Sequence, residues 1–303
     1  MIKRSEVGNR FFWTILFVFI YVLGSKISLP FVDLSKALNV NETIAKGLEL
    51  TSASMGGTLR GLSVFSTGLS PWMSSMILWK MFSVSKRFNL EKTSTEIIER
   101  RKMYLALALA IIQALAISIY LPLQTNLDPL LVICLNTMIM VAGTFFLVWL
   151  SDLNAALGLG NSFVIIMAGM ILYLPEDIMG ILSKINIPLI WYISGLGFVL
   201  VFVYTAVLME YARYRIPVNK LGIHNNLQSY TFLDLKLNPA GGMPFMYAMT
   251  LVSIPQYILL LVLYLDPNAS WAVQLSKKIV LGEPLWILLY ILMICFLSFA
   301  FAF

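Results

Sequence analysis

Long apolar runs alternate with short polar or Gly-rich stretches along the whole of this chain. A helix of about 20 predominantly apolar residues is long enough to cross the hydrocarbon core of a membrane. The pattern predicts eight spans, at about 11–29, 64–82, 103–121, 130–150, 162–174, 191–209, 239–263 and 284–303. The fifth run is short, so we expect protein neighbours rather than lipid around it.

The first and last runs need separate interpretations. The first continues from Phe11 to Leu23 without a small-residue cleavage site, so it is interpreted as a span and not as a signal peptide. The last run reaches Phe303 with no charge after Glu283. A membrane span is normally followed by a polar segment. We therefore expect a longer membrane protein, of which this chain is a C-terminally truncated part.

The composition supports an all-α polytopic membrane protein. Of the 303 residues, 59% are hydrophobic and 12% are charged, whereas soluble domains carry roughly 25% charged residues. No stretch remains for a soluble domain. Cys134 and Cys295 both lie in predicted spans, where we expect them to be buried as small hydrophobic side chains. They predict neither a disulfide nor a metal site.

The net charge of +6 comes mainly from basic residues at the ends of the spans. Such residues precede the first span, recur through residues 82–102 and return in residues 213–236. Because cytoplasmic loops of membrane proteins carry an excess of Lys and Arg, this pattern predicts a cytoplasmic N-terminus. Basic clusters confined to span ends are not typical of a nucleic-acid-binding surface, so no nucleic-acid partner is expected.

Two segments depart from the simple alternation of spans and short loops. Residues 50–70 are small and Gly-rich, and such a segment either folds back into a protein-lined cavity or forms a loop outside the membrane. Residues 213–237 form a basic loop on the predicted cytoplasmic side. That loop suits a cytoplasmic protein partner or anionic lipid headgroups, but its charges are also ordinary determinants of topology.

No catalytic constellation stands out, so the chain is not expected to be an enzyme or to hold a cofactor. His224 is the only histidine, which argues against a His-based metal site or triad. The sequence contains no nucleotide-binding G-x-x-x-x-G-K-[ST] loop. Ionisable residues are nearly absent from the centres of the spans, which argues against an ion-coupled carrier. Uncharged polar residues such as Ser74, Gln113 and Asn238 are most often helix–helix hydrogen-bonding groups.

Six strings of residues resemble the SecY family, whose members form the central subunit of protein-conducting channels. The strings are 23–30, 56–60 with 63–74, 143–150 with 158–161, 213–218, 237–244 and 284–290. They occur in the family's order and spacing. The family has ten spans in two inverted halves, so the resemblance implies an inverted-repeat helical bundle with eight of ten spans present. Residues 1–174 would form the N-terminal half and residues 175–303 a partial C-terminal half.

Two departures resemble the accessory branch of the family in Gram-positive bacteria. Gly158–Ser162 reads Gly-Leu-Gly-Asn-Ser where the family usually has Gly-Ile-Gly-Asn-Gly, and the stretch after Val218 is short and lacks the usual basic run. This branch exports serine-rich surface glycoproteins with its own SecA-type motor. The resemblance therefore implies a plasma-membrane channel that acts on unfolded secretory polypeptide. Its partners would be an accessory SecA-type ATPase and small SecE- or SecG-like or accessory membrane subunits.

Positions in the family's motifs also imply functional residues. The pore ring would comprise Leu69, Met73, Ile166 (or Ile165) and Met246. The plug, at about residues 54–62, would include Ser54, Met55, Gly56, Gly57, Leu59 and Arg60. The lateral gate would include Ser74, Gln113 and Asn238, and the motor would dock at Arg213, Arg215 and Lys220. The alternative is a secondary transporter of small solutes, a class that also uses inverted repeats and broken helices.

Overall fold

The computed structural model describes residues 4–32, 57, 62–84, 94–123, 128–160, 163–184, 189–217, 232–237, 241–266, 269–280 and 282–302. The chain divides into two compact units, of which the first contains residues 1–175 and 246–294 and the second residues 176–245 and 295–303. Helices α6 (Phe163–Lys184), α8 (Met243–Leu265) and α10 (Pro284–Ala302) each begin in one unit and end in the other. The predicted division at residue 174 concerns inverted halves rather than these units, and it stays a prediction.

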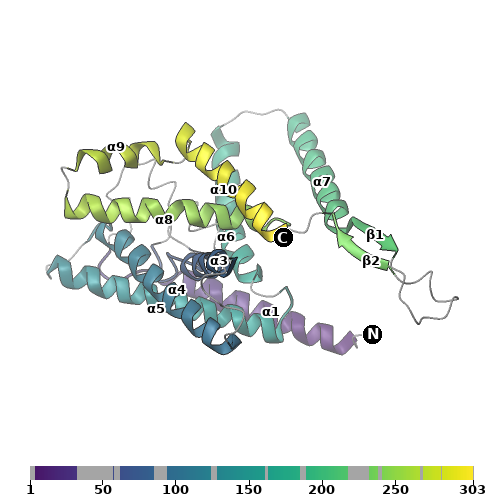
Figure 1. Cartoon of the computed structure of the whole chain (residues 1–303), viewed down its shortest axis with the longest axis horizontal. Helices are drawn as coiled ribbons and strands as arrows, with labels where there is room; N and C mark the ends of the chain where they lie inside the picture. Colours follow the sequence, from purple (N-terminus) through teal and green to yellow (C-terminus); the bar gives the residue numbers. More distant parts are fainter. Residues whose placement is uncertain are drawn as a thin grey trace. The chain divides into compact units, whose positions relative to one another are not determined.

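Apolar helices occupy all eight predicted span positions within the described residues (Figure 1). Four helical segments are long and apolar enough to cross a membrane: Val7–Ser25 of α1 (Arg4–Ser25), α4 (Thr95–Ile119), α5 (Pro129–Leu157) and α8. Shorter apolar segments lie at Phe163–Leu172, Gly197–Tyr211 and Pro284–Ala300. The predicted second span corresponds to α3 (Ser70–Val84). The prediction of a helical polytopic membrane protein is therefore confirmed.

The first two spans have other boundaries than the apolar pattern predicts. Helix α1 ends at Ser25 rather than at residue 29. Residues 64–69 form turns, so α3 begins only at Ser70. Hydropathy detects apolar segments and does not distinguish a helix from buried turns. The turns before α3 are buried and apolar, so the apolar pattern includes them in the span.

The helix at the predicted fifth span is longer than the apolar run that predicts it, although the apolar segment itself is short, at Phe163–Leu172. Helix α6 continues through Pro175 to Lys184 and has 22 residues. The apolar pattern stops at this point because the charged residues Glu176 and Asp177 follow the proline. Proline removes one backbone donor, but a membrane helix tolerates it where neighbouring groups satisfy the freed carbonyl.

Small residues let α4 pack closely against its neighbours in the first unit. Ala106, Ala110 and Ala114 follow one another at every fourth position and are all buried. Residues four apart share one face of a helix, and small residues on that face allow helix backbones to approach in a membrane. Helix α4 accordingly packs against both α3 and α5.

Gly143 on α5 lies directly against the turns that precede α3. A Cβ added at Gly143 would collide with the carbonyl oxygen and a side-chain methyl of Val64. Because the obstacle includes backbone, it cannot move aside by changing a rotamer. Glycine at this position therefore sets the distance between α5 and the turns.

Cys134 and Cys295 are exposed, so the prediction that both are buried is wrong. The buried face of α5 contains Val132, Asn136 and Met140, each four residues from the next, and Cys134 lies on another face. Lipid tails are as apolar as a leucine side chain. Composition alone therefore does not separate the lipid-facing side of a membrane helix from its buried side.

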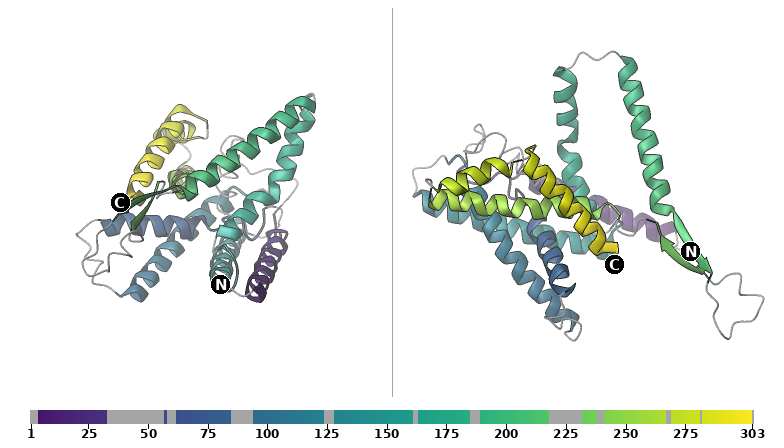
Figure 2. Two further views of the ribbon diagram at one scale, coloured as in Figure 1. Left: turned by 90° about the vertical axis from the view of Figure 1, so that its right-hand side faces the viewer. Right: turned by 45° about the horizontal axis from the view of Figure 1, so that its top comes forward.

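A short helix that the apolar pattern does not reveal, α9 (Ser270–Lys278), connects α8 to α10. Its buried Ala272 lies in one apolar cluster with Val252 of α8 and Trp286 of α10, and α9 lies beside α8 in Figures 1 and 2. The side-chain amide of Gln256 on α8 donates a hydrogen bond of 2.8 Å to the carbonyl oxygen of Ile279, just after α9. Apolar packing and this hydrogen bond together fix the connection to α8.

The second unit contains α7 (Leu189–Tyr211) and a two-stranded antiparallel hairpin. Strand β1 (Arg213–Pro217) pairs with β2 (Phe232–Lys236), and only Ala212 separates β1 from the helix. The views in Figures 1 and 2 show the hairpin leaving the end of α7. The pattern of charged residues predicts a basic loop here and no strands.

We expect Gly143→Ala to lower the stability of the protein by about 1–3 kcal/mol, because overpacking against backbone forces the surrounding structure to shift. Gly195→Ala on α7 is the matched control, since a Cβ at Gly195 meets no atom within 4 Å and Ala is the better helix former by about 1 kcal/mol. Thermal unfolding of both variants is followed in detergent. A midpoint for Gly143→Ala at or above that of Gly195→Ala would contradict the close contact with Val64.

Candidate functional site: an apolar cluster and its surroundings

The four predicted ring residues lie in one apolar cluster of the first unit. Leu69 precedes α3, Met73 lies on α3, Ile166 on α6 and Met246 on α8. Leu69 and Ile166 have no exposed surface and Met73 is 5% exposed, while Met246 is partly buried and packs against the buried members. Ile165 is equally buried in the same cluster, so burial does not choose between the two isoleucines. Side chains far apart in the sequence therefore meet here; that they act as a pore ring stays a prediction.

Backbone hydrogen bonds tie the turns at residues 62–69 to the residues just after α1. The N–H of Leu29 donates to the carbonyl oxygen of Leu62, at 2.9 Å, and the N–H of Val64 donates to that of Ile27, at 3.1 Å. These bonds pair main-chain groups that would otherwise be buried without partners. The chain before α3 is therefore held in place although it is not helical.

Side chains hold the same turns against α1 and α5. Phe65 is stacked between Tyr21 of α1 and Phe146 of α5, with ring centroids 5.9 and 6.0 Å away and an interplanar angle of 9° in both pairs. The hydroxyl groups of Thr67 and Thr144 are hydrogen bonded at 2.6 Å. An aromatic pair of this kind stabilises by about 0.5–1.5 kcal/mol beyond the area that it buries. The position of Leu69, at the end of the turns, is set by these contacts.

Ser74 and Gln113, predicted for the lateral gate, are both buried but are not hydrogen bonded to each other. Their exposed fractions are 0 and 1%. The Ser74 hydroxyl donates to the carbonyl oxygen of Ser70 in its own helix, at 2.8 Å. Neither atom of the Gln113 amide has a hydrogen-bond partner in the described part of the chain. Asn238, the third predicted gate residue, lies outside the described residues.

Two hydrogen bonds between helices were not predicted from the sequence. The Tyr120 hydroxyl donates to the carbonyl oxygen of Leu260, at 3.0 Å, and so joins the end of α4 to α8. The Ser75 hydroxyl donates to the carbonyl oxygen of Lys102, at 2.6 Å, and joins α3 to α4. Ser75 stands out as a polar residue within a span. Tyr120 does not, because tyrosine at the end of a span is ordinarily an interfacial anchor.

Most of the predicted plug lies outside the described residues, namely Ser54, Met55, Gly56, Leu59 and Arg60. Gly57 is described and is buried. Leu62, which ends the predicted segment, is 6% exposed and has a backbone φ of 43°. A positive φ is uncommon for a residue other than glycine. The chain therefore turns sharply at Leu62 as it enters the turns before α3.

The predicted docking arginines lie in the second unit, on β1, and both have partners within the hairpin. Arg213 Nη1 is 3.5 Å from Asp234 Oδ2 and Arg215 Nε is 3.4 Å from Asp234 Oδ1. The guanidinium carbon of Arg215 lies 4.5 Å from the centroid of the Phe232 ring. The arginine side chains are still 48 and 68% exposed. Lys220, the third predicted docking residue, lies outside the described residues.

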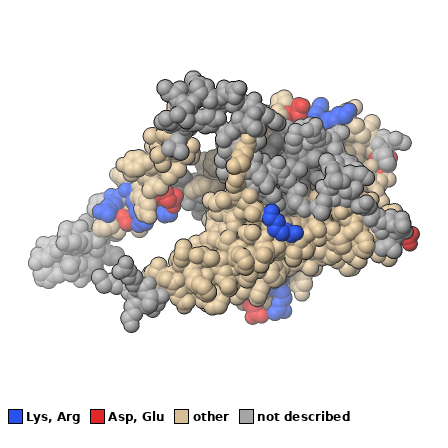
Figure 3. All heavy atoms as spheres, turned by 180° about the vertical axis from the view of Figure 1, so that it is seen from behind, with Lys and Arg blue, Asp and Glu red and all other residues tan. Residues whose placement is uncertain are grey.

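Charged side chains are sparse over the described surface seen in Figure 3. Basic and acidic groups lie close together on the left of that view, over the hairpin. Among the described residues, no three or more His, Cys, Asp or Glu side chains are grouped so as to hold a metal ion. The broad uncharged surface is the kind that membrane helices present to lipid.

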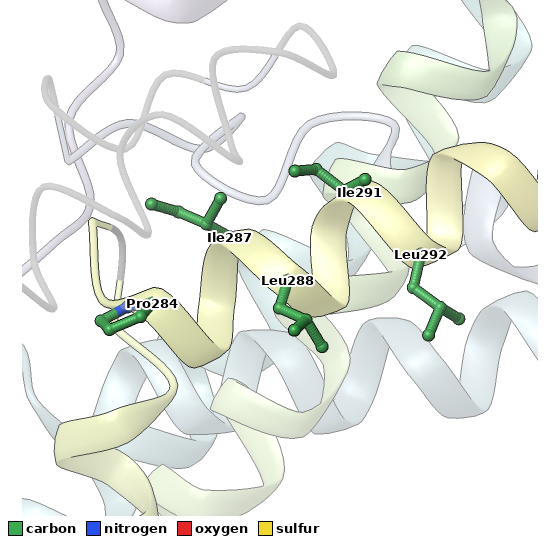
Figure 4. A pocket seen from close by; sticks show the side chains of 5 residues that line it. All are labelled: Pro284, Ile287, Leu288, Ile291 and Leu292. Carbon is green, nitrogen blue, oxygen red and sulfur yellow. The ribbon is translucent and has the colours of Figure 1, made fainter.

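A shallow apolar groove of about 480 Å³ runs along the first part of α10 (Figure 4). It is lined by Pro284, Ile287, Leu288, Ile291 and Leu292. Their spacing of three and four residues places them on neighbouring rows of the helix surface, and Figure 4 shows the two isoleucines and the two leucines pointing to different sides. These five side chains offer no hydrogen-bonding group to a small solute. The groove therefore suits acyl chains or an apolar helix.

Comparison with known proteins gives consistent matches over this chain. The SecY family model matches residues 63–303. The accessory Sec system protein translocase subunit SecY2 of Streptococcus sanguinis is 51% identical over 302 residues, which cover 99% of this chain and 74% of that protein. The subunit of the same name from Streptococcus gordonii is 50% identical over 303 residues, with 99 and 74% coverage. That from Leuconostoc gelidum is 36% identical over 316 residues, with 98 and 73% coverage.

Solved structures of channels share the fold at low sequence identity. The structure of a protein conducting channel matches with a TM-score of 0.66 and 13% identity, covering 99% of this chain and 73% of that one. Sec61 in the canine ribosome–channel complex matches with a TM-score of 0.58 and 14% identity, covering 87 and 61%. Together with the family model and the relatives above, these likenesses do not favour the alternative of a secondary transporter.

We expect Gln113→Leu to raise the midpoint of thermal unfolding, because an unpaired buried polar group costs about 1–3 kcal/mol. Gln256→Leu is the matched control, since the same substitution on α8 removes a hydrogen bond to the Ile279 carbonyl and should lower the midpoint. Both variants are measured in the same detergent. A fall for Gln113→Leu as large as that for Gln256→Leu would mean that the Gln113 amide has a partner in the membrane, such as ordered water.

Proposed function

Because this chain belongs to the SecY family, we propose that it is the central subunit of a protein-conducting channel that exports polypeptides across the plasma membrane. The likeness over nearly its whole length to accessory Sec translocase subunits carries this proposal. In that system the substrates are unfolded serine-rich surface glycoproteins. The protein crosses the membrane several times, and its N-terminus lies in the cytoplasm, as the distribution of basic residues predicts.

The apolar cluster of Leu69, Met73, Ile166 and Met246 is the constriction of this channel. An apolar constriction loses its water when it is empty, and this blocks the passage of ions. It also offers no charged group that would bind an ion. Methionine is unbranched and adaptable, and two of the four residues are methionines. Such a ring deforms around a passing polypeptide without specific recognition of its sequence.

The lateral gate lies where α4 meets α8 in the first unit. The hydrogen bond from Tyr120 to the Leu260 carbonyl is a direct polar link across that boundary. Hydrogen bonds between membrane helices contribute on average about 0.6 kcal/mol. A link of this strength keeps the helices in register but yields to an apolar signal segment that enters between them.

Energy for transport comes from a partner, an accessory SecA-type ATPase. The motor docks on the basic hairpin that follows α7 and on the loop that begins after α3. Small SecE- or SecG-like or accessory membrane subunits complete the channel and cover part of its lipid-facing surface. The channel subunit itself performs no catalysis in this scheme.

Replacing Leu69 and Met73 together by serine is expected to increase ion leakage through the membrane, because polar side chains hydrate an apolar constriction. The control for loss of packing is Leu147→Ser, since Leu147 is equally buried in the same cluster but is not a proposed ring residue. Leakage is measured as dissipation of the membrane potential in vesicles that contain the assembled channel. The ring assignment fails if the double variant is as tight as wild type, or if Leu147→Ser leaks as much.

Arg213→Glu combined with Arg215→Glu is expected to weaken motor binding severalfold, because like charges replace attraction at the contact. Binding to nanodiscs is measured at low and high salt, beside a topology reporter that should not change. Asp234→Asn separates two explanations, because it removes the partner of both arginines but keeps their charge. If the arginines only hold the hairpin together, Asp234→Asn weakens binding as well. If they contact the motor, Asp234→Asn leaves binding unchanged or tightens it.

A further inference from the structure

The register of the β1–β2 hairpin separates its side chains into two faces. Directly opposed residues of an antiparallel pair point to the same side of the ribbon. Tyr214 is opposite Leu235 and Ile216 is opposite Leu233, so one face is wholly apolar. The exposed fractions of these four residues are 67, 46, 37 and 53%. An isolated two-stranded hairpin is at best marginally stable in water, and this face therefore needs a surface to cover it.

The opposite face of the hairpin carries its charges. Arg213 and Arg215 pair with Asp234, and Lys236 Nζ lies 2.9 Å from Glu210 Oε1 at the end of α7. Three cations on this face meet two carboxylates, which leaves one positive charge in excess. The hairpin is thus a two-sided ribbon with apolar side chains on one face and a mildly basic network on the other.

The hairpin begins where an apolar helix surface ends. The segment Gly197–Tyr211 of α7 is apolar, and all of its side chains are exposed. The N–H of Ala212 donates to the carbonyl oxygen of Leu208, at 2.9 Å, and the N–H of Leu237 donates to that of Ala212, at 3.0 Å. These bonds join the base of the hairpin to the helix without a linker.

The distance along the chain keeps the first residues of the hairpin at the level of the headgroup layer and its outer edge. A strand rises about 3.3 Å per residue, so Tyr214 lies within roughly 10 Å of Tyr211, at the end of the helix. The polar layer on each side of a bilayer is about 5–8 Å thick, given a core of about 30 Å within a total of about 40–45 Å. Tyr211 and Leu237 flank this level and are 75 and 63% exposed. Tyrosine is enriched at this depth of a membrane.

We propose that the base of this hairpin is a lipid anchor. Tyr214 and Leu235 on the apolar face lie against the headgroup and acyl boundary at the C-terminal end of α7. Lys236, near the same level on the other face, binds the phosphates of anionic lipids with its charged end. A bilayer covers the apolar pair nearest the helix, whereas a docking protein approaching from water meets the farther pair, Ile216 and Leu233, first.

The experiment measures depth by spin labels on the full chain in nanodiscs. Cys134 and Cys295 are first replaced by alanine, because both are exposed and would take up label. Single cysteines are then introduced at Leu208, Leu235 and Leu233, which lie in the helix, at the base of the hairpin and farther out on the same face. Collision with oxygen, which concentrates in lipid, is compared with collision with a water-soluble nickel chelate. The nanodiscs contain phosphatidylcholine alone or an equal mixture with phosphatidylglycerol.

The expected ratio of oxygen to nickel collision is highest at Leu208, intermediate at Leu235 and severalfold lower at Leu233. Phosphatidylglycerol should raise the ratio at Leu235, and Lys236→Gln should abolish that rise. The proposal is overturned if Leu235 is as accessible to nickel as Leu233 in both lipid compositions. It is equally overturned if Leu235 becomes protected only after a SecA-type motor is added, because the apolar face would then be a protein-binding surface.

Discussion

Residues 62–69 are almost all buried in the first unit without forming a helix, and in a membrane each unsatisfied backbone group costs several kcal/mol. The structure meets this constraint by pairing the turns with the residues just after α1, through Leu62 and Val64. It then holds them from the other side with the Thr67–Thr144 hydrogen bond on α5. The placement of Leu69 and Met73 in the apolar cluster follows from these bonds, since α3 starts where the turns end.

The same unit leaves other polar groups without partners in the part of the chain that is described. The side-chain amides of Gln113 and Asn136 are both buried and unpaired there. Each such group raises the free energy of the closed bundle relative to a state in which water reaches it. In the channel that we propose, such groups would lower the cost of separating the helices around them. The Tyr120–Leu260 link acts in the opposite direction and is weak enough to be broken.

The sequence predicts the helical spans well because about 20 apolar residues in a row have few other stable arrangements in a membrane. It also predicts which residues share the apolar cluster, but only through the family resemblance, because no periodicity brings Leu69 next to Met246. The errors have physical causes. Helix α6 continues past Pro175 and two charges, because a proline and charged residues end an apolar run but do not by themselves end a helix in a membrane protein. The exposure of Cys134 was not predicted, because lipid and protein interior are equally apolar and composition does not separate the two sides of a helix.

The hairpin after α7 was missed for a different reason. Its strands are only five residues long, and the alternation of Arg213, Tyr214, Arg215 and Ile216 is masked by the high basic charge, which favours interpretation as a loop. Its position in a charged connection gives no hydrophobic run to mark it. What identifies it is cross-strand register, a property of two segments that are separated in the sequence and that a pass along the chain treats one at a time.

The stack of Tyr21, Phe65 and Phe146 has a consequence for biogenesis. A membrane protein is inserted from its N-terminus as it is synthesised, and domains form in that order. Phe65 gains one neighbour as soon as α1 and the turns are in place, but its second face stays open until α5 has been made. The hydrogen bond between Thr67 and Thr144 likewise cannot form until α5 has been made. The contacts of Phe65 with Phe146 and of Thr67 with Thr144 therefore form only after α5 has been made, so the packing around these turns is completed by the fourth span rather than by the first three.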